Sequence, residues 1–168
     1  LRSLLALTLV ACGGSYGEAE VAGTVAGVDF SEIQAVYSGG RYLMLFTDKV
    51  DCVDTWWKRQ SYPSDPDNVF DGGDKAFFEG AIQLHVLGEG AKPQQGTLSV
   101  EDAEVAEGMI LSHPEGASTF ETIRATSGTW TVDEAGEDLE GELTLEFGDQ
   151  GYVNGVYKAV HCRNLTGG

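Results

Sequence analysis

Apolar and polar residues alternate with a period of two along most of this chain, the pattern of β-strands with one buried and one wet face. The clearest example is the segment 138–147, whose apolar face carries Leu139, Gly141, Leu143, Leu145 and Phe147. The opposite face carries three glutamates and a threonine. A cluster of turn residues, Gly148 to Gly151, separates this segment from a second alternating run over 152–161. The two runs predict a β-hairpin.

Two further segments predict strands by the same alternation. In 81–87 the inner face would carry Ile82, Leu84 and Val86, and in 127–132 it would carry Trp130 and Val132. The segment from Arg41 to Thr47 differs, because its residues 42–46 are apolar without alternation. A short run of this kind favours a central strand that is covered on both faces.

Turn residues recur between these runs, and the chain contains 23 glycines. No convincing amphipathic helix exceeds three turns. Many short strands separated by Gly, Asp and Pro indicate an all-β fold, and an antiparallel β-sandwich is the preferred architecture, with a β-barrel as the alternative. We expect a single β domain over residues 20–168, since no linker divides this region.

The chain begins with one arginine and a short apolar run, Leu4 to Ala11, followed directly by Cys12. This order is typical of an export signal, and the run is far shorter than the roughly 20 residues of a membrane-spanning helix. Leu9-Val10-Ala11-Cys12 resembles the lipobox of bacterial lipoproteins. The resemblance implies a signal peptide over 1–11, cleavage before Cys12 and lipid on the Cys12 thiol and the new amino terminus.

Lipid on Cys12 would make the membrane a partner of the protein, because two or more acyl chains form a stable anchor. Residue 13 is Gly, whereas Asp at this place is the usual inner-membrane retention signal of the lipoproteins that this motif resembles. The resemblance therefore implies an outer-membrane lipoprotein, either periplasmic or surface-exposed. Residues 12–19 would form a short lipidated tether, since the glycines that follow Cys12 favour a flexible segment.

With Cys12 used by lipid under this resemblance, Cys52 and Cys162 are left, and export places them in an oxidising compartment. They allow a single pairing, which would close a loop of about 110 residues. The less favoured alternative is a reactive thiol.

A second resemblance concerns the patterning around these two cysteines. The hydrophobic run before Cys52, the strand that contains Gly128-Thr129-Trp130 and the final hairpin ending in Cys162 resemble a set of uncharacterised β-sandwich lipoproteins. That resemblance implies the fold and the disulfide, and it implies no activity.

The chain is strongly acidic, with 27 Asp and Glu against 10 Lys and Arg and a formal net charge of −17. A nucleic acid needs a basic face to bind, so nucleic acid is excluded as a partner. Attachment to anionic lipid headgroups is excluded for the same reason. Lipid on Cys12 would therefore have to supply the attachment to the membrane.

The longest interruption of the strand pattern is the loop 48–75, and loops of this length in compact domains are usually functional or disordered. Trp56 and Trp57 are adjacent there, with Tyr62 nearby. Adjacent residues of an extended segment face opposite ways, so one ring would be exposed and could stack a sugar or contact a partner protein. The alternative is that both rings cap the open end of the sandwich beside Cys52.

The same loop carries four aspartates within ten residues, namely Asp65, Asp67, Asp71 and Asp74. Calcium takes six to eight oxygen ligands on a flexible loop, so this segment is the best candidate for a metal site. The spacing does not follow the EF-hand pattern. A solvated acidic loop without calcium is the favoured alternative.

No catalytic motif accompanies these candidates: the chain lacks a nucleophile elbow, a phosphate-binding glycine loop and a dinucleotide fingerprint. His85, His113 and His161 stand outside metal-type spacings, and we expect them to face solvent. The sequence therefore favours a non-catalytic binding or interaction module without a cofactor, whose ligand would be a protein or a glycan. A structural or assembly component of the cell envelope is the alternative, and a carboxylate-based hydrolase is the second alternative.

Overall fold

A computed structural model describes residues 16–52, 78–88, 90–101, 105–113, 121–136 and 138–165. Most of these residues lie in strands, and none lies in an α-helix, which confirms the all-β class. The strands are β1 (Glu18–Val25), β2 (Val28–Asp29), β3 (Ala35–Gly39), β4 (Tyr42–Phe46), β5 (Phe78–Val86), β6 (Gly96–Ser99), β7 (Ala106–His113), β8 (Glu121–Arg124), β9 (Ser127–Ala135), β10 (Leu139–Glu146) and β11 (Gly151–His161). Two single-turn 3-10 helices follow β10 and β11, η1 (Gly148–Gln150) and η2 (Arg163–Leu165).

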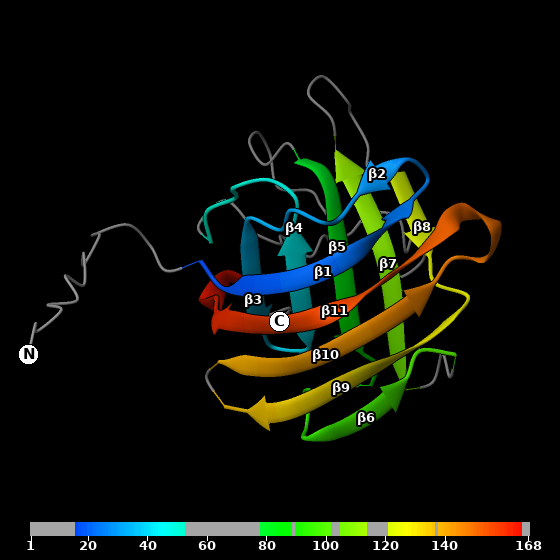
Figure 1. Cartoon of the computed structure of the whole chain (residues 1–168). Helices are drawn as coiled ribbons and strands as arrows, with labels where there is room; N and C mark the ends of the chain where they lie inside the picture. The colour runs from blue at the N-terminus through cyan, green and yellow to red at the C-terminus, as the bar shows by residue number, and fades with distance from the viewer. Residues whose placement is uncertain are drawn as a thin grey trace, which may run out of the picture.

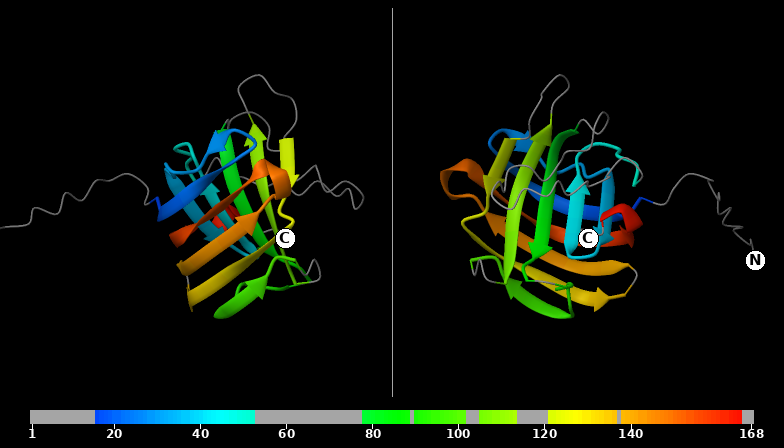
Figure 2. Two further views of the ribbon diagram at one scale, coloured as in Figure 1. Left: turned by 45° about the vertical axis from the view of Figure 1, so that its right-hand side comes forward. Right: turned by 180° about the vertical axis from the view of Figure 1, so that it is seen from behind.

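All the strands belong to one curled sheet in the order β6-β9-β10-β11-β3-β4-β5-β7-β8, with β1 on β11 and β2 on β1. We call β1, β6, β9, β10 and β11 the first arm, and β3, β4, β5, β7 and β8 the second arm. The strands of the two arms run across one another around a shared interior, so the sheet forms a half-barrel (Figures 1 and 2). The two arms face each other as the two layers of the expected sandwich would. Backbone hydrogen bonds nevertheless join the arms into one sheet, as in the expected alternative, a barrel.

The joint between the arms is short, and among the described strands it is the one pairing that is not antiparallel. β11 pairs in parallel with β3 over two residue pairs, Val160 with Tyr37 and His161 with Ser38. The other strand pairs are antiparallel, including the predicted hairpin of β10 and β11, which aligns Leu139 with Ala159. The hairpin prediction is confirmed.

The inner core lies between the arms and takes the apolar face of each alternating strand. Trp130 and Val132 of β9 and Ile82, Leu84 and Val86 of β5 are buried there, as the sequence predicts. Leu143 and Leu145 of β10 complete the same cluster from the first arm. The period-two pattern therefore identifies the inner face correctly.

A second apolar cluster covers the outer face of the second arm. Met44 and Phe46 of β4 pack there with Tyr37, Phe78 and Leu165, while Leu43 and Leu45 point to the inner core. This arrangement explains why residues 42–46 do not alternate, because β4 lies between β3 and β5 and has both faces covered. The prediction of a central strand is confirmed.

The domain begins earlier than the boundary expected at residue 20. β1 starts at Glu18, and Tyr16 packs against the Tyr37 ring with their centroids 6.4 Å apart. The Tyr16 hydroxyl donates a hydrogen bond to Asp51, and the Lys49 ammonium lies 4.8 Å from the Tyr16 ring centroid. Residues 16–19 therefore belong to the domain rather than to a tether, because contacts with distant residues hold them.

Candidate functional site

Cys52 and Cys162 form the disulfide that the sequence predicts, with their Cα atoms 5.7 Å apart across a separation of 110 residues. Cys162 is fully buried directly after β11, and its amide donates a hydrogen bond of 2.7 Å to the Ser38 carbonyl of β3. The disulfide therefore ties the end of β11 to the segment after β4, beside the short joint between the arms. The remaining predicted site residues lie outside the described ranges: Cys12, Trp56, Trp57, Tyr62, Asp65, Asp67, Asp71 and Asp74.

The described ranges contain neither a cluster of metal-ligating side chains nor a membrane-crossing helix. Within those ranges, no group of three or more His, Cys, Asp and Glu side chains is placed to hold a metal ion. In the same part of the chain, no helix has the length and apolar character that crossing a membrane requires. The calcium site expected at 65–74 stays a prediction, since it falls on other residues.

The outer surface of the first arm contains a shallow hollow of about 540 Å³. The strands of this arm lie nearer the viewer in Figure 1. Strands β1, β9, β10 and β11 all contribute to the hollow. We call it the acidic hollow, because its charged residues are four carboxylates and one ammonium. Its outward side chains are Glu18, Glu20, Asp133, Glu140, Val156 and Lys158.

Pairing between strands from opposite ends of the chain creates this charge pattern. Lys158 of β11 lies between Glu18 of β1 and Glu140 of β10 in the strand register. It forms an exposed ion pair with Glu140, whose hydrogen bond and charge raise the pKa of the Lys158 ammonium. Lys158 is the one cation among the described residues that line the hollow, and it faces four carboxylates, so the surface keeps an excess of negative charge.

Two large apolar side chains are exposed on the same outer face. Val156 is 51% exposed and lies between Glu20 and Glu142, and Tyr152 is 55% exposed and lies next to Glu146. Both belong to β11, which has neighbouring strands on both sides rather than a free edge. Both side chains point outward on one acidic sheet face, which makes that face a candidate contact surface.

Beneath the hollow, polar groups inside the core are paired by hydrogen bonds. The buried Trp130 indole donates a hydrogen bond of 2.8 Å to the Tyr157 hydroxyl, which donates in turn to the Thr131 carbonyl at 3.1 Å. Burial raises the pKa of the Tyr157 phenol, so the hydroxyl keeps its proton. Gly141 is directly opposite Tyr157, and a Cβ there would lie 2.8 Å from the hydroxyl.

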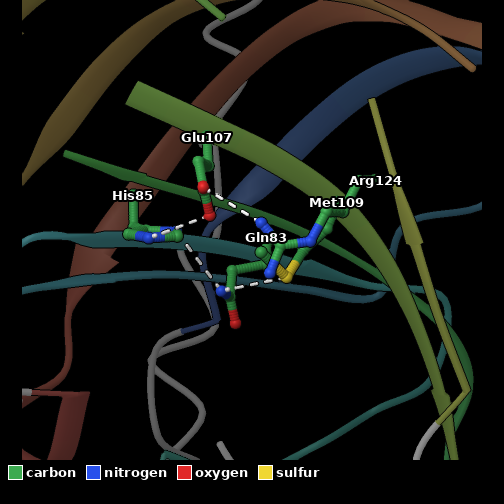
Figure 3. Close-up of polar contacts among 5 residues, drawn as sticks. All are labelled: Gln83, His85, Glu107, Met109 and Arg124. Atoms are coloured by element: carbon green, nitrogen blue, oxygen red, sulfur yellow. Dashed lines mark hydrogen bonds and ion pairs between the residues drawn. The ribbon is translucent and has the colours of Figure 1, made fainter. Parts of the chain in front are cut away.

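A second group of polar side chains lies on the outer face of the second arm (Figure 3). Glu107 accepts a hydrogen bond of 3.0 Å from Arg124, and its other carboxylate oxygen lies 3.6 Å from His85 Nε2. Gln83 Nε2 lies 3.5 Å from His85 Nδ1 and 3.4 Å from the Met109 sulfur. The Gln83 side chain is buried, and its Oε1 has no hydrogen-bond partner.

His85 is therefore not the solvent-facing residue that its position on the polar face predicts. Its side chain is 12% exposed, because the outer apolar cluster of the second arm extends toward it and the Tyr42 ring lies 5.5 Å away. Both ring nitrogens face protein groups, Gln83 on one side and Glu107 on the other. This placement suits a structural imidazole better than a general base, which needs a nitrogen directed at substrate.

His85 makes the stability of the domain sensitive to acid. Burial lowers the pKa of His85 from its ordinary value, although Glu107 opposes the change. The unfolded chain then binds a proton more readily than the folded domain, so stability is highest above about pH 6.5 and falls as the pH decreases through the folded-state pKa. Urea unfolding at pH 7.5 and pH 5.0 should show a smaller loss in His85→Gln than in the wild type.

The matched control is His161→Gln, which removes an exposed imidazole and should keep the wild-type difference between the two pH values. Carboxylates other than Glu107, which contacts His85, contribute alike to all three proteins, so the comparison isolates His85 together with that contact. An identical pH dependence in the wild type and His85→Gln would refute the assignment.

Comparison with known protein families, curated proteins and solved structures finds no match for this chain. The class that the structure itself defines is an acidic, disulfide-linked β half-barrel. The features of its surface must therefore support any functional conclusion.

Sequence reasoning missed the acidic hollow, although part of the signal was present. The alternation that places Val153 and Tyr157 inside also places Tyr152 and Val156 on the wet face, where a tyrosine and a valine are unexpected. The same alternation places the glutamates of β10 together on one solvent-facing side of that strand. The contribution of β1 could not be found in this way, because its alignment with β11 depends on the tertiary fold.

Proposed function

We propose that this chain is a lipid-anchored, non-catalytic binding module of the bacterial outer membrane, and that the acidic hollow binds a basic segment of a partner protein. The observation that carries the proposal is the exposure of Val156 and Tyr152 in the middle of an acidic sheet face. Aromatic and apolar anchors supply most of the energy of protein contacts, and surrounding charges select the partner.

The charges around Val156 indicate the chemistry of the partner. Glu20 and Glu142 lie on either side of Val156, and Glu18 and Asp133 add further carboxylates. A segment with Lys or Arg next to an apolar residue would pair with the carboxylates while covering Val156. Tyr152, four residues along the strand and about 13 Å away, would provide a second anchor.

Two features support a location in the envelope. The Leu9-Val10-Ala11-Cys12 motif resembles a lipobox, and the Cys52–Cys162 disulfide is of the kind that forms in oxidising compartments. Tyr16 lies four positions after Cys12, a reach of about 14 Å when extended. A lipid on Cys12 would therefore hold the domain close to the membrane. The partner protein would then have to be accessible at the membrane surface.

Site-specific photocrosslinking tests the proposal. A benzoylphenylalanine replaces Val156 in the full chain expressed in a bacterial host, and the same probe replaces the exposed Glu32 in a control. We expect a discrete crosslinked protein from position 156 only, and its loss when Glu20→Gln and Glu142→Gln are added. The matched control pair is Glu101→Gln with Glu121→Gln, which removes two exposed carboxylates elsewhere and should retain the product.

Fractionation of the same cells tests the anchor. The wild type should sediment with the outer membrane, and Cys12→Ala should release the folded domain from it. Continued membrane retention of Cys12→Ala would overturn the anchor. Absence of a crosslink specific to position 156, or a crosslink indifferent to the two glutamates, would overturn the proposed contact surface and favour the structural role.

A further inference from the structure

The two methionines of the chain lie on the outer face of the second arm, on either side of the same glutamine. Met44 of β4 and Met109 of β7 are both directly opposite Gln83 of β5 in the strand register. All three side chains are buried, with no more than 4% of each exposed. Neighbours across strands on one face of a sheet have their Cβ atoms about 5 Å apart, so both thioethers are within reach of the Gln83 amide.

The Gln83 amide lies between two electron-pair donors. Its Nε2 lies 3.4 Å from the Met109 sulfur and 3.5 Å from His85 Nδ1 (Figure 3). The Gln83 Oε1, by contrast, has no hydrogen-bond partner among the described residues, although the side chain is only 1% exposed. A buried carbonyl oxygen without a partner is destabilising. A cation is the kind of group that would satisfy the sulfur, the ring nitrogen and this oxygen together.

Glu107 prepares His85 for such a role. Its Oε2 lies 3.6 Å from His85 Nε2, and its Oε1 is held at 3.0 Å by Arg124. A carboxylate on this side favours the tautomer with the proton on Nε2, which leaves the Nδ1 lone pair facing Gln83. A carboxylate behind the second ring nitrogen is the usual arrangement around a metal-binding histidine. Burial also lowers the pKa of His85, so the imidazole is neutral at neutral pH, as a metal ligand must be.

We propose that a soft monovalent metal ion, copper(I), binds on strands β4, β5 and β7, with ligands from Met44, Gln83, His85 and Met109. Thioether sulfur selects copper(I) over hard cations, and imidazole also suits copper. All four donors are uncharged, so a single positive charge is the one that costs least to bury among them. This donor set differs from groups of three or more His, Cys, Asp and Glu, which the described residues do not form.

A turn of one side chain creates the geometry that the ion requires. The Gln83 carboxamide rotates about its last side-chain bond, a soft torsion, and Oε1 then takes the present place of Nε2. There it lies 3.4 Å from the Met109 sulfur and 3.5 Å from His85 Nδ1. Donors at this spacing suit an ion that is bound at about 2.0 to 2.3 Å to each of them.

Titration with silver(I) tests the site, because silver(I) is soft and monovalent like copper(I) and needs no reductant that would break the disulfide. The full chain with Cys12→Ala is used in detergent, so that the one cysteine outside the Cys52–Cys162 bond does not compete for the metal. With the methionine methyl groups labelled by carbon-13, we expect the NMR signals of both methionines to shift as one equivalent of silver(I) binds. Zinc(II), the divalent comparison, should leave both signals in place.

Calorimetric titration of variants measures the contribution of each ligand. Loss of a group behind a metal ligand commonly weakens binding about 10- to 100-fold, so Glu107→Gln should weaken silver(I) binding about tenfold. Loss of a ligand should cost more, about a hundredfold or more, in each of His85→Gln, Met44→Leu and Met109→Leu.

Two controls separate metal binding from packing. His161→Gln removes an exposed imidazole, and Phe78→Leu alters the same outer apolar cluster without removing a metal donor. Both variants should keep the affinity for silver(I). Melting temperatures without metal show whether each variant is folded, and silver(I) should raise the melting temperature of the parent chain but not that of His85→Gln.

Three outcomes would overturn the proposal: methyl signals that do not move with silver(I), zinc(II) binding as tight as silver(I) binding, or an affinity indifferent to the ligand variants. Each would leave the cluster as a purely structural part of the core. The metal site lies on the second arm and the acidic hollow on the first, so none of these results bears on the crosslink at Val156.

Discussion

Removal of the Cys52–Cys162 disulfide should lower the free energy of unfolding by about 4 to 5 kcal/mol, the largest effect that we expect from any change in this domain. The bond closes a loop of 110 residues and so restricts the unfolded chain strongly. It also lies beside the joint between the arms, where β11 and β3 share only two residue pairs. Losing it should weaken this joint first.

Urea unfolding of the wild type with and without reductant, and of the Cys52→Ser and Cys162→Ser double variant, measures this effect. Reductant should change the wild type and leave the double variant unaffected. Native-state hydrogen exchange adds a local measurement, since the Cys162 amide bonded to Ser38 should lose protection before the amides of β10. A loss of stability below about 1 kcal/mol would show that the long loop is already restricted by other contacts.

Trp130→Ala should lower the free energy of unfolding by about 3 to 5 kcal/mol, because it removes the largest side chain of the inner core. Tyr157→Phe should cost less, about 1 to 3 kcal/mol, by leaving the buried Trp130 indole without its hydrogen-bond acceptor. Both substitutions act beneath the acidic hollow, at the hydrogen bond between the Trp130 indole and the Tyr157 hydroxyl.

The matched control is Tyr152→Phe, which removes the same hydroxyl from an exposed tyrosine on the same strand and should change stability by less than about 0.5 kcal/mol. Urea unfolding of the three variants under identical conditions gives the comparison. If Tyr157→Phe and Tyr152→Phe had equal effects, the hydrogen bond between Trp130 and Tyr157 would contribute nothing to the fold.

The strands that could be predicted are those whose evidence is local. The hairpin of β10 and β11 follows from alternation around Gly148 to Gly151, and the central position of β4 follows from its unbroken apolar run. The start of the domain could not be predicted, because Tyr16 is held by Tyr37, Lys49 and Asp51 rather than by its neighbours in the chain. Alternation alone also could not reveal that His85 is nearly buried, because the groups that cover it come from other parts of the chain.

The candidate sites also differ in whether their residues are close in the sequence or are brought together only by the fold. Aromatic residues and aspartates of the loop 48–75 could be predicted as candidate sites because they are close together in the chain. Those at 56–74 lie outside the described residues. The acidic hollow combines residues that are distant in sequence, such as Glu18 with Lys158. Sequence reasoning had no means to bring these residues together.

By itself, the sequence determined the all-β class, the inner face of most strands and the Cys52–Cys162 pairing. Side-chain direction in a strand follows from a period of two, and if Cys12 carries lipid, as the lipobox resemblance implies, the other two cysteines allow a single bond. Only the tertiary structure decided that the sheet closes through β11 and β3 into a half-barrel, that β1 lies against β11, and which charges share a surface. Strand neighbours are chosen by packing and hydrogen bonding across long separations, and no local pattern of residues encodes that choice.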